Sequence, residues 1–271
     1  MEAISKYYLE YGHLEPIKNY TNDSLDRGRI IYEVIRVINN VPLFYEDHLK
    51  RLESSFRLME KPFSYSYDKI KEYLTKLIEA NKIENGNIKL TFDIKTDTMK
   101  VFSIKHNYPN ENLYKTGVKT ILFHGERTNP NAKVVDSSFR EKVTEEINKA
   151  SAFEAILVNN SGFITEGSKS NIFLIKEDKL YTSPLEDVLP GVTRGRIINL
   201  AKSLGIKVEE KNINYKDIEN FDAMFISGTS PKILPISSVD NIQLSIDNEM
   251  MQVLIKEFNE EIKKYVNKFK K

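Results

Sequence analysis

The sequence predicts a two-domain protein of the α/β (α+β) class, with helices and strands interspersed along both parts of the chain. Three observations support this. The chain has 271 residues, enough for two domains with a substantial interior. Segments rich in β-branched and apolar residues recur between amphipathic helical stretches. Residues 107–117 are punctuated by Asn, Pro and Gly and lack apolar periodicity, so they form the candidate linker.

The N-terminal domain, residues 1–112, is predicted to be a small α+β unit. Its first clear strand starts at Ile30 and returns after Asn39-Asn40, a pattern typical of a hairpin. Alternation places Tyr32 and Arg36 on one face of this strand and Glu33 on the other. Apolar stripes predict helices, and β-rich runs predict further strands, at residues 46–59, 68–81, 87–95 and 99–106.

The larger C-terminal domain is predicted to span residues 118–271. Helices are expected at residues 137–152, 193–205 and 250–269, the second ending at Gly205 as a C-cap. The segment after Gly228 contains prolines and is predicted to be a loop. Strands are expected at residues 118–125, 154–160, 162–167, 171–176, 179–184 and 223–228.

Composition excludes several classes of function. Lys and Arg together number 40 and Asp and Glu 39, so the chain lacks the positive field that favours nucleic-acid binding. The absence of cysteine excludes disulfides, thiolate metal sites and cysteine nucleophiles. The histidines outside the motifs discussed below fit no metal-ligand spacing. No apolar run is long enough to span a bilayer and no signal peptide is evident, so a cytoplasmic protein without a membrane partner is expected.

Four separate segments carry residues suited to binding a charged small molecule. VLPGVTR places Val192 and Thr193 in the first turn of a helix, where free N–H groups suit a phosphate. SGTSP offers Thr229 and Ser230 after a strand. In isolation, a plain helix cap and a plain turn explain these two segments better.

The other two segments carry charges. EDHLKRLESS places His48, Arg51 and Ser55 along one side of a helix, where a guanidinium could grip a phosphate or simply lie at the surface. GFITEGSKSNIF holds Glu166 between two strongly β segments. A carboxylate there is either a turn former or a partner for a cationic group.

In order and wording, these segments resemble the class IV pyridoxal-phosphate family, which includes branched-chain aminotransferases, D-amino-acid aminotransferases and aminodeoxychorismate lyases. The resemblance covers both domains, and the pair EGSKSNIF and LPGVTR is highly specific. It implies the fold-type IV architecture, with a small α+β N-terminal domain and a larger barrel-like C-terminal domain carrying the cofactor lysine. It also implies pyridoxal 5'-phosphate as cofactor and a homodimer.

The resemblance also implies roles for particular residues. Lys133 in NPNAKVVD matches the lysine that forms the Schiff base with the cofactor. The competing lysines, Lys142 and Lys149, lie inside the following predicted helix and fit the family's interval poorly. Glu166 matches the acidic residue that pairs with the pyridine nitrogen. The residues that match the phosphate-binding positions are Arg51, Val192, Thr193, Thr229 and, more weakly, Ser230.

The implied activity is transfer of an amino group between an amino acid and a 2-oxo acid, both small-molecule substrates. Tyr32 and Arg36 share a strand face and are the candidates for binding the substrate, with Arg127 as a further possible ligand of its carboxylate. The alternative activity is that of a 4-amino-4-deoxychorismate lyase, releasing pyruvate and 4-aminobenzoate. A third hypothesis, a silent scaffold, is disfavoured because Lys133, Glu166 and Arg51 are all intact.

Two departures from the family limit what the sequence can say about substrate. Many of the aminotransferases carry a Tyr shortly after the lysine, whereas this chain has Ser137 and Ser138 there. The Arg-x-His pair with which D-amino-acid aminotransferases hold the substrate carboxylate is absent from residues 91–102. The amino acid and its enantiomer therefore stay open.

Overall fold

A computed structural model describes residues 2–21 and 30–270 of the chain. The chain divides into two compact units, which are described separately. The first comprises residues 1–107, 132–137 and 262–271, and the second comprises residues 108–131 and 138–261. The sequence-based domain limits, 1–112 and 118–271, stay a prediction.

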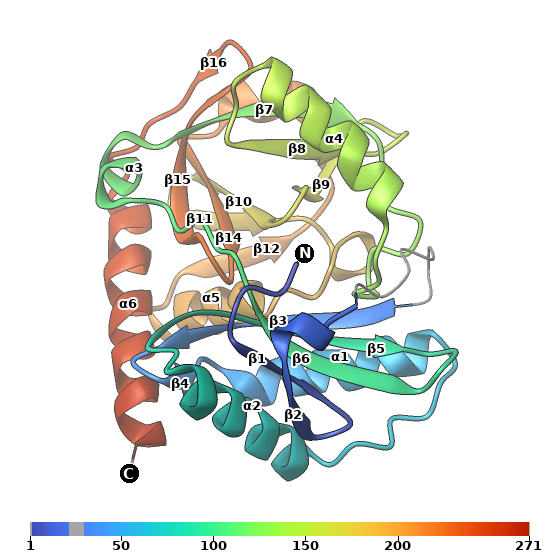
Figure 1. Ribbon diagram of the computed structural model, residues 1–271. Helices are drawn as coiled ribbons and strands as arrows, with labels where there is room; N and C mark the ends of the chain where they lie inside the picture. Colours follow the sequence, from blue (N-terminus) through green and yellow to red (C-terminus); the bar gives the residue numbers. More distant parts are fainter. Residues whose placement is uncertain (1, 22–29, 271) are drawn as a thin grey trace. The chain divides into compact units, whose positions relative to one another are not determined.

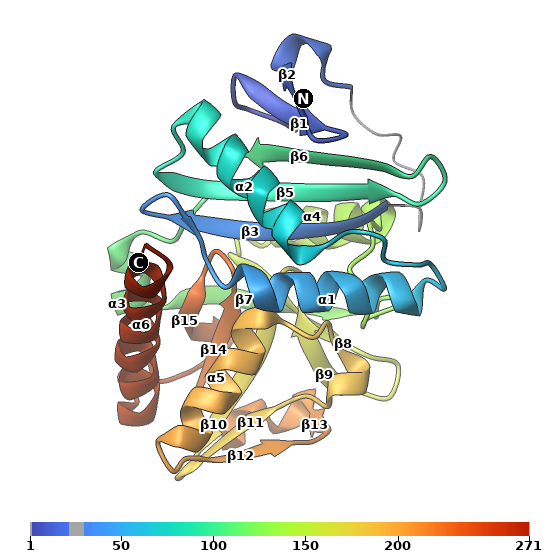
Figure 2. The same ribbon diagram turned by 90° about the horizontal axis from the view of Figure 1, so that it is seen from below.

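The first unit is built on a six-stranded antiparallel sheet, with α1 (Tyr45–Leu58) and α2 (Tyr67–Asn81) lying along one of its faces (Figure 2). Both helices begin and end within one residue of the predicted positions. The strands, in their order across the sheet, are β2 (His13–Pro16), β1 (Tyr7–Glu10), β6 (Thr98–Ile104), β5 (Asn85–Asp93), β3 (Ile30–Ile38) and β4 (Val41–Pro42).

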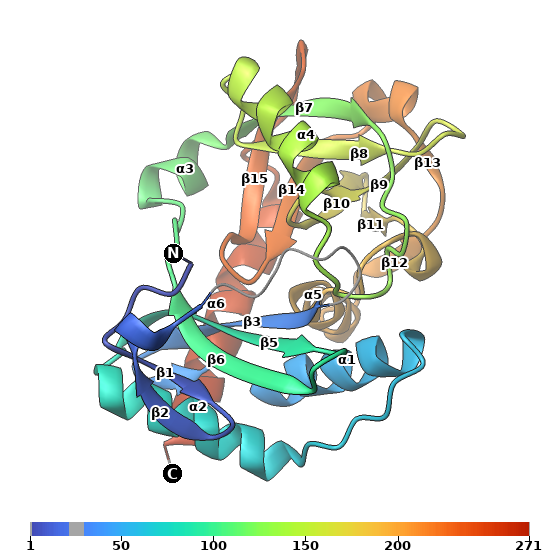
Figure 3. The same cartoon turned by 45° about the vertical axis from the view of Figure 1, so that its right-hand side comes forward.

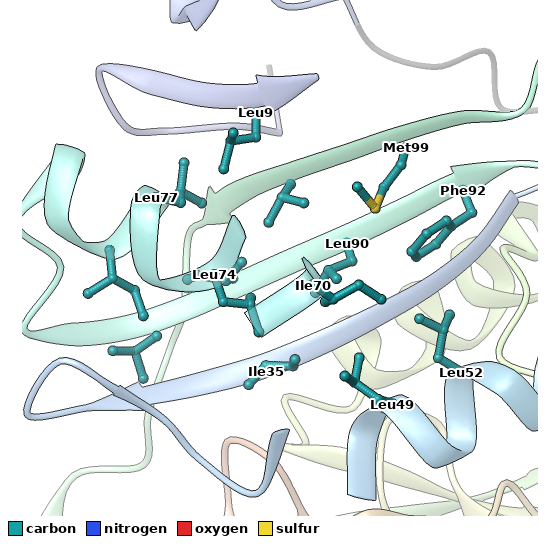
Figure 4. Close-up of a cluster of buried hydrophobic side chains, with 14 of the residues drawn as sticks. Leu9, Ile35, Leu49, Leu52, Ile70, Leu74, Leu77, Leu90, Phe92 and Met99 are labelled. Carbon is teal, nitrogen blue, oxygen red and sulfur yellow. The ribbon is translucent and has the colours of Figure 1, made fainter. Parts of the chain in front are cut away.

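The core of this unit lies between the helices and the sheet (Figure 4). Ile35 of β3 and Leu90 of β5 meet Leu49 of α1 and Leu74 of α2, and all four side chains are fully buried. Apolar side chains at helical spacing thus pack on one face of the pleated sheet, as the sequence pattern indicated. Burying each such side chain stabilises the fold by roughly 1.5–3 kcal/mol.

The predicted hairpin after β3 is confirmed. Asn39 and Asn40 have φ angles of 51° and 66°, the left-handed conformation that a tight two-residue turn between antiparallel strands requires. Asn adopts this conformation at lower cost than most residues. Strands β1 and β2 were not predicted, because four-residue strands give too short an alternation to recognise.

The second unit is built on a ten-stranded mixed sheet that curls into a half-barrel (Figure 3). Its central strands β15 (Lys232–Val239), β7 (Val118–His124) and β8 (Glu154–Val158) pair in parallel. The remaining strands are β9 (Phe163–Gly167), β10 (Asn171–Lys176), β11 (Lys179–Thr182), β12 (Lys207–Glu210), β13 (Ile213–Asn214), β14 (Ala223–Gly228) and β16 (Ile242–Gln243).

Strand β8 carries a continuous apolar run, AILV, after Glu154. Ala155 and Leu157 pack under Val143 of helix α4 (Ser137–Lys149), which covers this part of the sheet (Figure 1). Ile156 points to the opposite side, into the main cluster of the half-barrel. Because both faces of the strand are covered, alternation between polar and apolar residues disappears.

Two further helices lie in the C-terminal part of the chain. Helix α5 (Val192–Ser203) follows the LPG turn, and the long α6 (Glu249–Phe269) starts one residue before its predicted position. No helix among residues 2–21 and 30–270 is long and apolar enough to cross a membrane.

Two predictions of secondary structure were wrong. The proline-containing loop after Gly228 is largely β15, eight residues long, with Pro235 opposite Phe225 of β14. On its other side β15 pairs with β7 only from Ile236, so no neighbour there needs an N–H from Pro235. The candidate linker contains the short helix α3 (Glu111–Thr116), whose N-cap Asn110 accepts a hydrogen bond from the Leu113 N–H.

Candidate active site

Lys133 lies in the first unit, where its backbone is held on both sides. Its N–H donates to Ser55 Oγ at 3.2 Å, and its carbonyl accepts from the Tyr32 N–H at 3.0 Å. The neighbouring Val134 forms an antiparallel bridge with Ile31 of β3. With the backbone fixed, Lys133 Nζ lies 4.7 Å from the centre of the Tyr32 ring, a cation–π distance. Two residues predicted independently, Lys133 and Tyr32, therefore meet.

Ser55 links this lysine to helix α1. Its hydroxyl donates to the Arg51 carbonyl at 3.0 Å, one turn earlier, and accepts from the Lys133 N–H. The hydroxyl is fully buried and uses both its donor and an acceptor site. The predicted alignment of His48, Arg51 and Ser55 on one side of the helix thus has a structural consequence, because it places three polar groups beside Lys133 and β3.

Arg51 is engaged by a fully buried carboxylate, Glu33 of β3. Its Nε donates to Glu33 Oε1 at 2.8 Å and its Nη2 to Oε2 at 2.7 Å, a side-on bidentate pair. His48 Nδ1 lies 2.9 Å from Glu33 Oε2. Since a carboxylate only accepts, Nδ1 must carry the hydrogen, and its 3.3 Å approach to Arg51 Nη2 is a contact and not a hydrogen bond.

The charges of this cluster are set by burial and by the neighbours. Burial alone would raise the pKa of Glu33, but the Arg51 charge and the hydrogen bonds from Arg51 and His48 outweigh it and lower the pKa to about 2. Burial lowers the pKa of His48, and the nearby charges of Arg51 and Lys133 act in the same direction against the opposing effect of Glu33. At neutral pH the cluster is therefore an ionised Glu33–Arg51 pair with a neutral histidine.

Arg36 lies on the same face of β3 as Tyr32, four residues further along. Four residues of strand correspond to roughly 13 Å. Its side chain is half-buried and the residue lies opposite Asn87 of β5. Arg36 thus shares the face of Tyr32 at a distance that only its long side chain can bridge.

The second unit holds Glu166 on β9, with 4% of its surface exposed. Its Oε1 accepts from Arg127 Nη1 at 3.0 Å, and its Oε2 accepts from the Leu189 N–H at 3.0 Å. Arg127 also donates to the Pro130 carbonyl at 3.3 Å. A buried carboxylate paired with a guanidinium is held in one orientation, which distinguishes Glu166 from the turn former considered at the outset.

The LPG turn is clamped by two residues of the EGSKSN segment. Glu166 accepts from the N–H of Leu189, and Asn171 Nδ2 donates to the carbonyl of the same residue at 3.0 Å. Asn171 also lies opposite Ser227 at the start of the SGTSP segment, through the pairing of β10 with β14. The three motif segments of the second unit, far apart in sequence, therefore meet around Asn171.

Helix α5 begins directly after this clamp. Its N-cap is Gly191, which offers no side-chain oxygen, and Val192 and Thr193 of the first turn are buried. A helix N-terminus presents N–H groups without intrahelical partners and the positive end of the helix dipole. Thr229 and Ser230 occupy the turn between β14 and β15 and are half-buried. The sequence-predicted anion-binding groups of this unit are thus present at a helix start and a turn.

Gly191 is required at the turn for steric reasons. A Cβ atom there would overlap Asn171 Oδ1. Gly191→Ala should therefore lower the free energy of unfolding by about 1–3 kcal/mol, the usual cost of overpacking a filled site. Gly195→Ala in the same helix is the matched control, since nothing lies within 4 Å of the added methyl group, and it should stabilise the helix. Equal urea midpoints for the two variants would contradict this account of the clamp.

Comparisons with known proteins show the family of this chain. The sequence model of the amino-transferase class IV family matches residues 30–239. The chain belongs to the amino-transferase class IV family. It is 28% identical over 231 residues to a D-alanine aminotransferase of Bacillus licheniformis, covering 79% of this chain and 80% of that protein. It is 29% identical over 245 residues to the branched-chain-amino-acid aminotransferase of Escherichia coli K12, covering 82% and 79%.

The fold of the class IV family is also confirmed. The structure of a branched-chain aminotransferase from Thermobaculum terrenum, in its pyridoxal-phosphate form, superposes with a TM-score of 0.80. The match is 22% identical in sequence and covers 97% of this chain and 95% of that one. The resemblance and the fold class predicted from the motifs are therefore correct, and class IV membership indicates an enzyme.

Sequence reasoning missed several residues that shape the candidate site. Glu33 was assigned only to a strand face, although a carboxylate among apolar residues is itself a signal of a buried pair. Asn171 lies in the EGSKSNIF segment, in which only Glu166 was singled out. Glu154 is a third case, because its buried carboxylate accepts from the N–H groups of Ser168 and Lys169 and from both neighbouring serine hydroxyls. It fixes the loop that follows Glu166.

Proposed function

We propose that this protein is a pyridoxal-phosphate-dependent aminotransferase that moves an amino group between an amino acid and a 2-oxo acid, with Lys133 as the lysine that binds the cofactor covalently. Membership of the class IV family and the relatives described above support the proposal. The observation that carries it is the fixation of Lys133 between Ser55 and Tyr32, which holds its amine at a defined place.

The residues of each unit fit this cofactor. Glu166 is a buried carboxylate with two donors already in place, and carboxylate oxygens can accept further hydrogen bonds, so a protonated pyridine nitrogen could join Arg127 and the Leu189 N–H. The buried first turn of α5 suits a phosphate ester. Arg51 binds Glu33 through Nε and Nη2, and a guanidinium has five N–H donors in a planar arrangement that suits a phosphate.

In the proposed mechanism each residue has a separate task. Bound pyridoxal phosphate supplies an electron sink that stabilises negative charge at the substrate Cα. The Lys133 amine would take the proton from the substrate Cα as general base and deliver it to the cofactor as general acid. Glu166 would keep the ring nitrogen protonated. The phosphate would be held by Val192, Thr193, Thr229, Ser230 and Arg51, and the substrate by Tyr32 and Arg36.

The proposal is tested by following the visible absorption of the protein loaded with pyridoxal phosphate. An amino donor alone should change the cofactor spectrum in one half-reaction, and a 2-oxo acid should restore it, as ping-pong kinetics require. Release of pyruvate from 4-amino-4-deoxychorismate without any 2-oxo acid acceptor would identify the lyase instead. A loaded protein whose spectrum responds to no amino acid would contradict the aminotransferase assignment.

A further inference from the structure

Lys89 lies on the face of the first unit's sheet that carries Tyr32. It stands directly opposite Val34 in the antiparallel pairing of β5 with β3, and directly opposed residues point to the same face. Tyr32 and Arg36 are its diagonal neighbours on β3, at a separation that long side chains can span. Lys89 therefore lies between the two residues assigned to substrate binding.

The ammonium groups of Lys89 and Lys133 both lie near the Tyr32 ring. Lys89 Nζ lies 5.1 Å from the centre of the Tyr32 ring, and Lys133 Nζ lies 4.7 Å from it. The Lys89 side chain is 12% exposed, so protein covers most of its surface. An ammonium on such a side chain is favoured when an anion beside it compensates its charge.

A carboxylate of the chain itself provides this compensation. Glu2 Oε1 lies 2.6 Å from Lys89 Nζ, although the Glu2 side chain is 46% exposed. The neighbouring backbone explains its position, because Ala3 forms an antiparallel bridge with Ile104 at the end of β6 and the Ile4 N–H donates to the Ser103 carbonyl. The position beside Lys89 thus accepts a carboxylate that can reach it from solvent.

We infer that Lys89 binds a carboxylate of the amino-acid substrate and that the Glu2 carboxylate competes for the same position. The inference rests on the proposed function, which it deepens by naming a specificity-determining residue. A substrate held by Lys89 lies beside the Tyr32 ring, near which Lys133 Nζ also lies. The carboxylate is either the α-carboxylate or the second carboxylate of a dicarboxylic amino acid, and the experiment distinguishes them.

The test compares Lys89→Met with Lys100→Met in the loaded enzyme. Met keeps the length and apolar stem of the side chain and removes the charge. Losing a charged hydrogen bond should raise KM for the amino donor roughly 10- to 100-fold, with kcat and cofactor affinity little changed. Lys100 is the matched control, because it lies on the same sheet near the Tyr20 ring and pairs with Glu10. Its replacement should leave KM unchanged.

Two further comparisons complete the experiment. A rise in KM for both alanine and glutamate assigns the α-carboxylate to Lys89, and a rise for glutamate alone assigns the side-chain carboxylate. Glu2→Gln should lower KM by up to about fivefold, the value of a partly exposed ion pair, and should have no effect in the Lys89→Met background. An equal effect of Glu2→Gln on KM in the wild-type and Lys89→Met backgrounds would show that Glu2 does not compete with the substrate for Lys89.

Binding of unreactive carboxylates separates this inference from the proposed function. Calorimetry with acetate and succinate measures their dissociation constants whether or not the protein turns over. Weaker binding of either carboxylate to the Lys89→Met variant than to the wild type and Lys100→Met supports the inference. Unchanged binding and unchanged KM in Lys89→Met overturn it, whereas a wild type that binds carboxylates but transfers no amino group contradicts only the aminotransferase assignment.

Discussion

Replacing Lys133 with alanine is expected to remove the covalently bound cofactor band and to lower amino-group transfer by a factor of roughly 100 to 10,000, the usual contribution of a general acid and base. The fold should survive, because the contacts that fix this position are made by the Lys133 backbone, with Ser55 and Tyr32, and alanine retains both groups. The loss should therefore be chemical and not structural.

The measurement is the visible spectrum of wild type and Lys133→Ala, each incubated with pyridoxal phosphate and then with amino acids. Lys142→Ala and Lys149→Ala are the controls. Both lysines lie on α4 and are exposed, and Lys149 pairs with Glu145 and Glu146 at the surface. If the band persists in Lys133→Ala and disappears in one of the controls, the cofactor is bound by that other lysine and the assignment of Lys133 is wrong.

The elements of this fold that could be predicted are those with a sufficiently long local pattern. Helix α2 carries an apolar stripe over four turns, so its start was predicted within a residue. The turn was predicted because Asn39 and Asn40 are residues that adopt the left-handed conformation of a two-residue hairpin. Strand β15 had no such pattern, because Pro235 interrupts it and only its pairing with β14 and β7 makes that position acceptable.

The residues of the candidate site also fall into two groups: those that a local segment predicts and those whose position depends on distant parts of the chain. Short segments of characteristic amino-acid sequence made it possible to predict Lys133, Glu166 and the LPGVT turn. The contact of Lys133 with Tyr32 depends on segments about a hundred residues apart, and the position of Lys89 depends on the register between β3 and β5. A strand register is fixed by packing and turn geometry across the whole sheet, so no single segment encodes it.

Glu33 is another residue whose role required the structure, and Glu33→Gln should be strongly destabilising. The substitution keeps the shape of the side chain but leaves the Arg51 guanidinium buried without its counter-charge. Removing one partner of a buried ion pair typically costs about 3–5 kcal/mol. Glu72→Gln on α2 is the control, because Glu72 pairs with Lys69 at the surface and both side chains are more than half exposed, so its loss should cost less than about 1 kcal/mol.

The pH dependence of this effect identifies its origin. The pKa of Glu33 is lowered from 4.5 to about 2 in the folded protein, so its ionised form stabilises the fold fully above pH 4.5. This contribution is lost as the pH falls through about 2, and the difference between wild type and Glu33→Gln should shrink across that interval. Urea unfolding of both proteins between pH 7 and pH 3 measures it. A difference that stays constant with pH would mean that altered packing, and not the lost charge, destabilises the variant, and Arg51 would then need no counter-charge to keep its orientation.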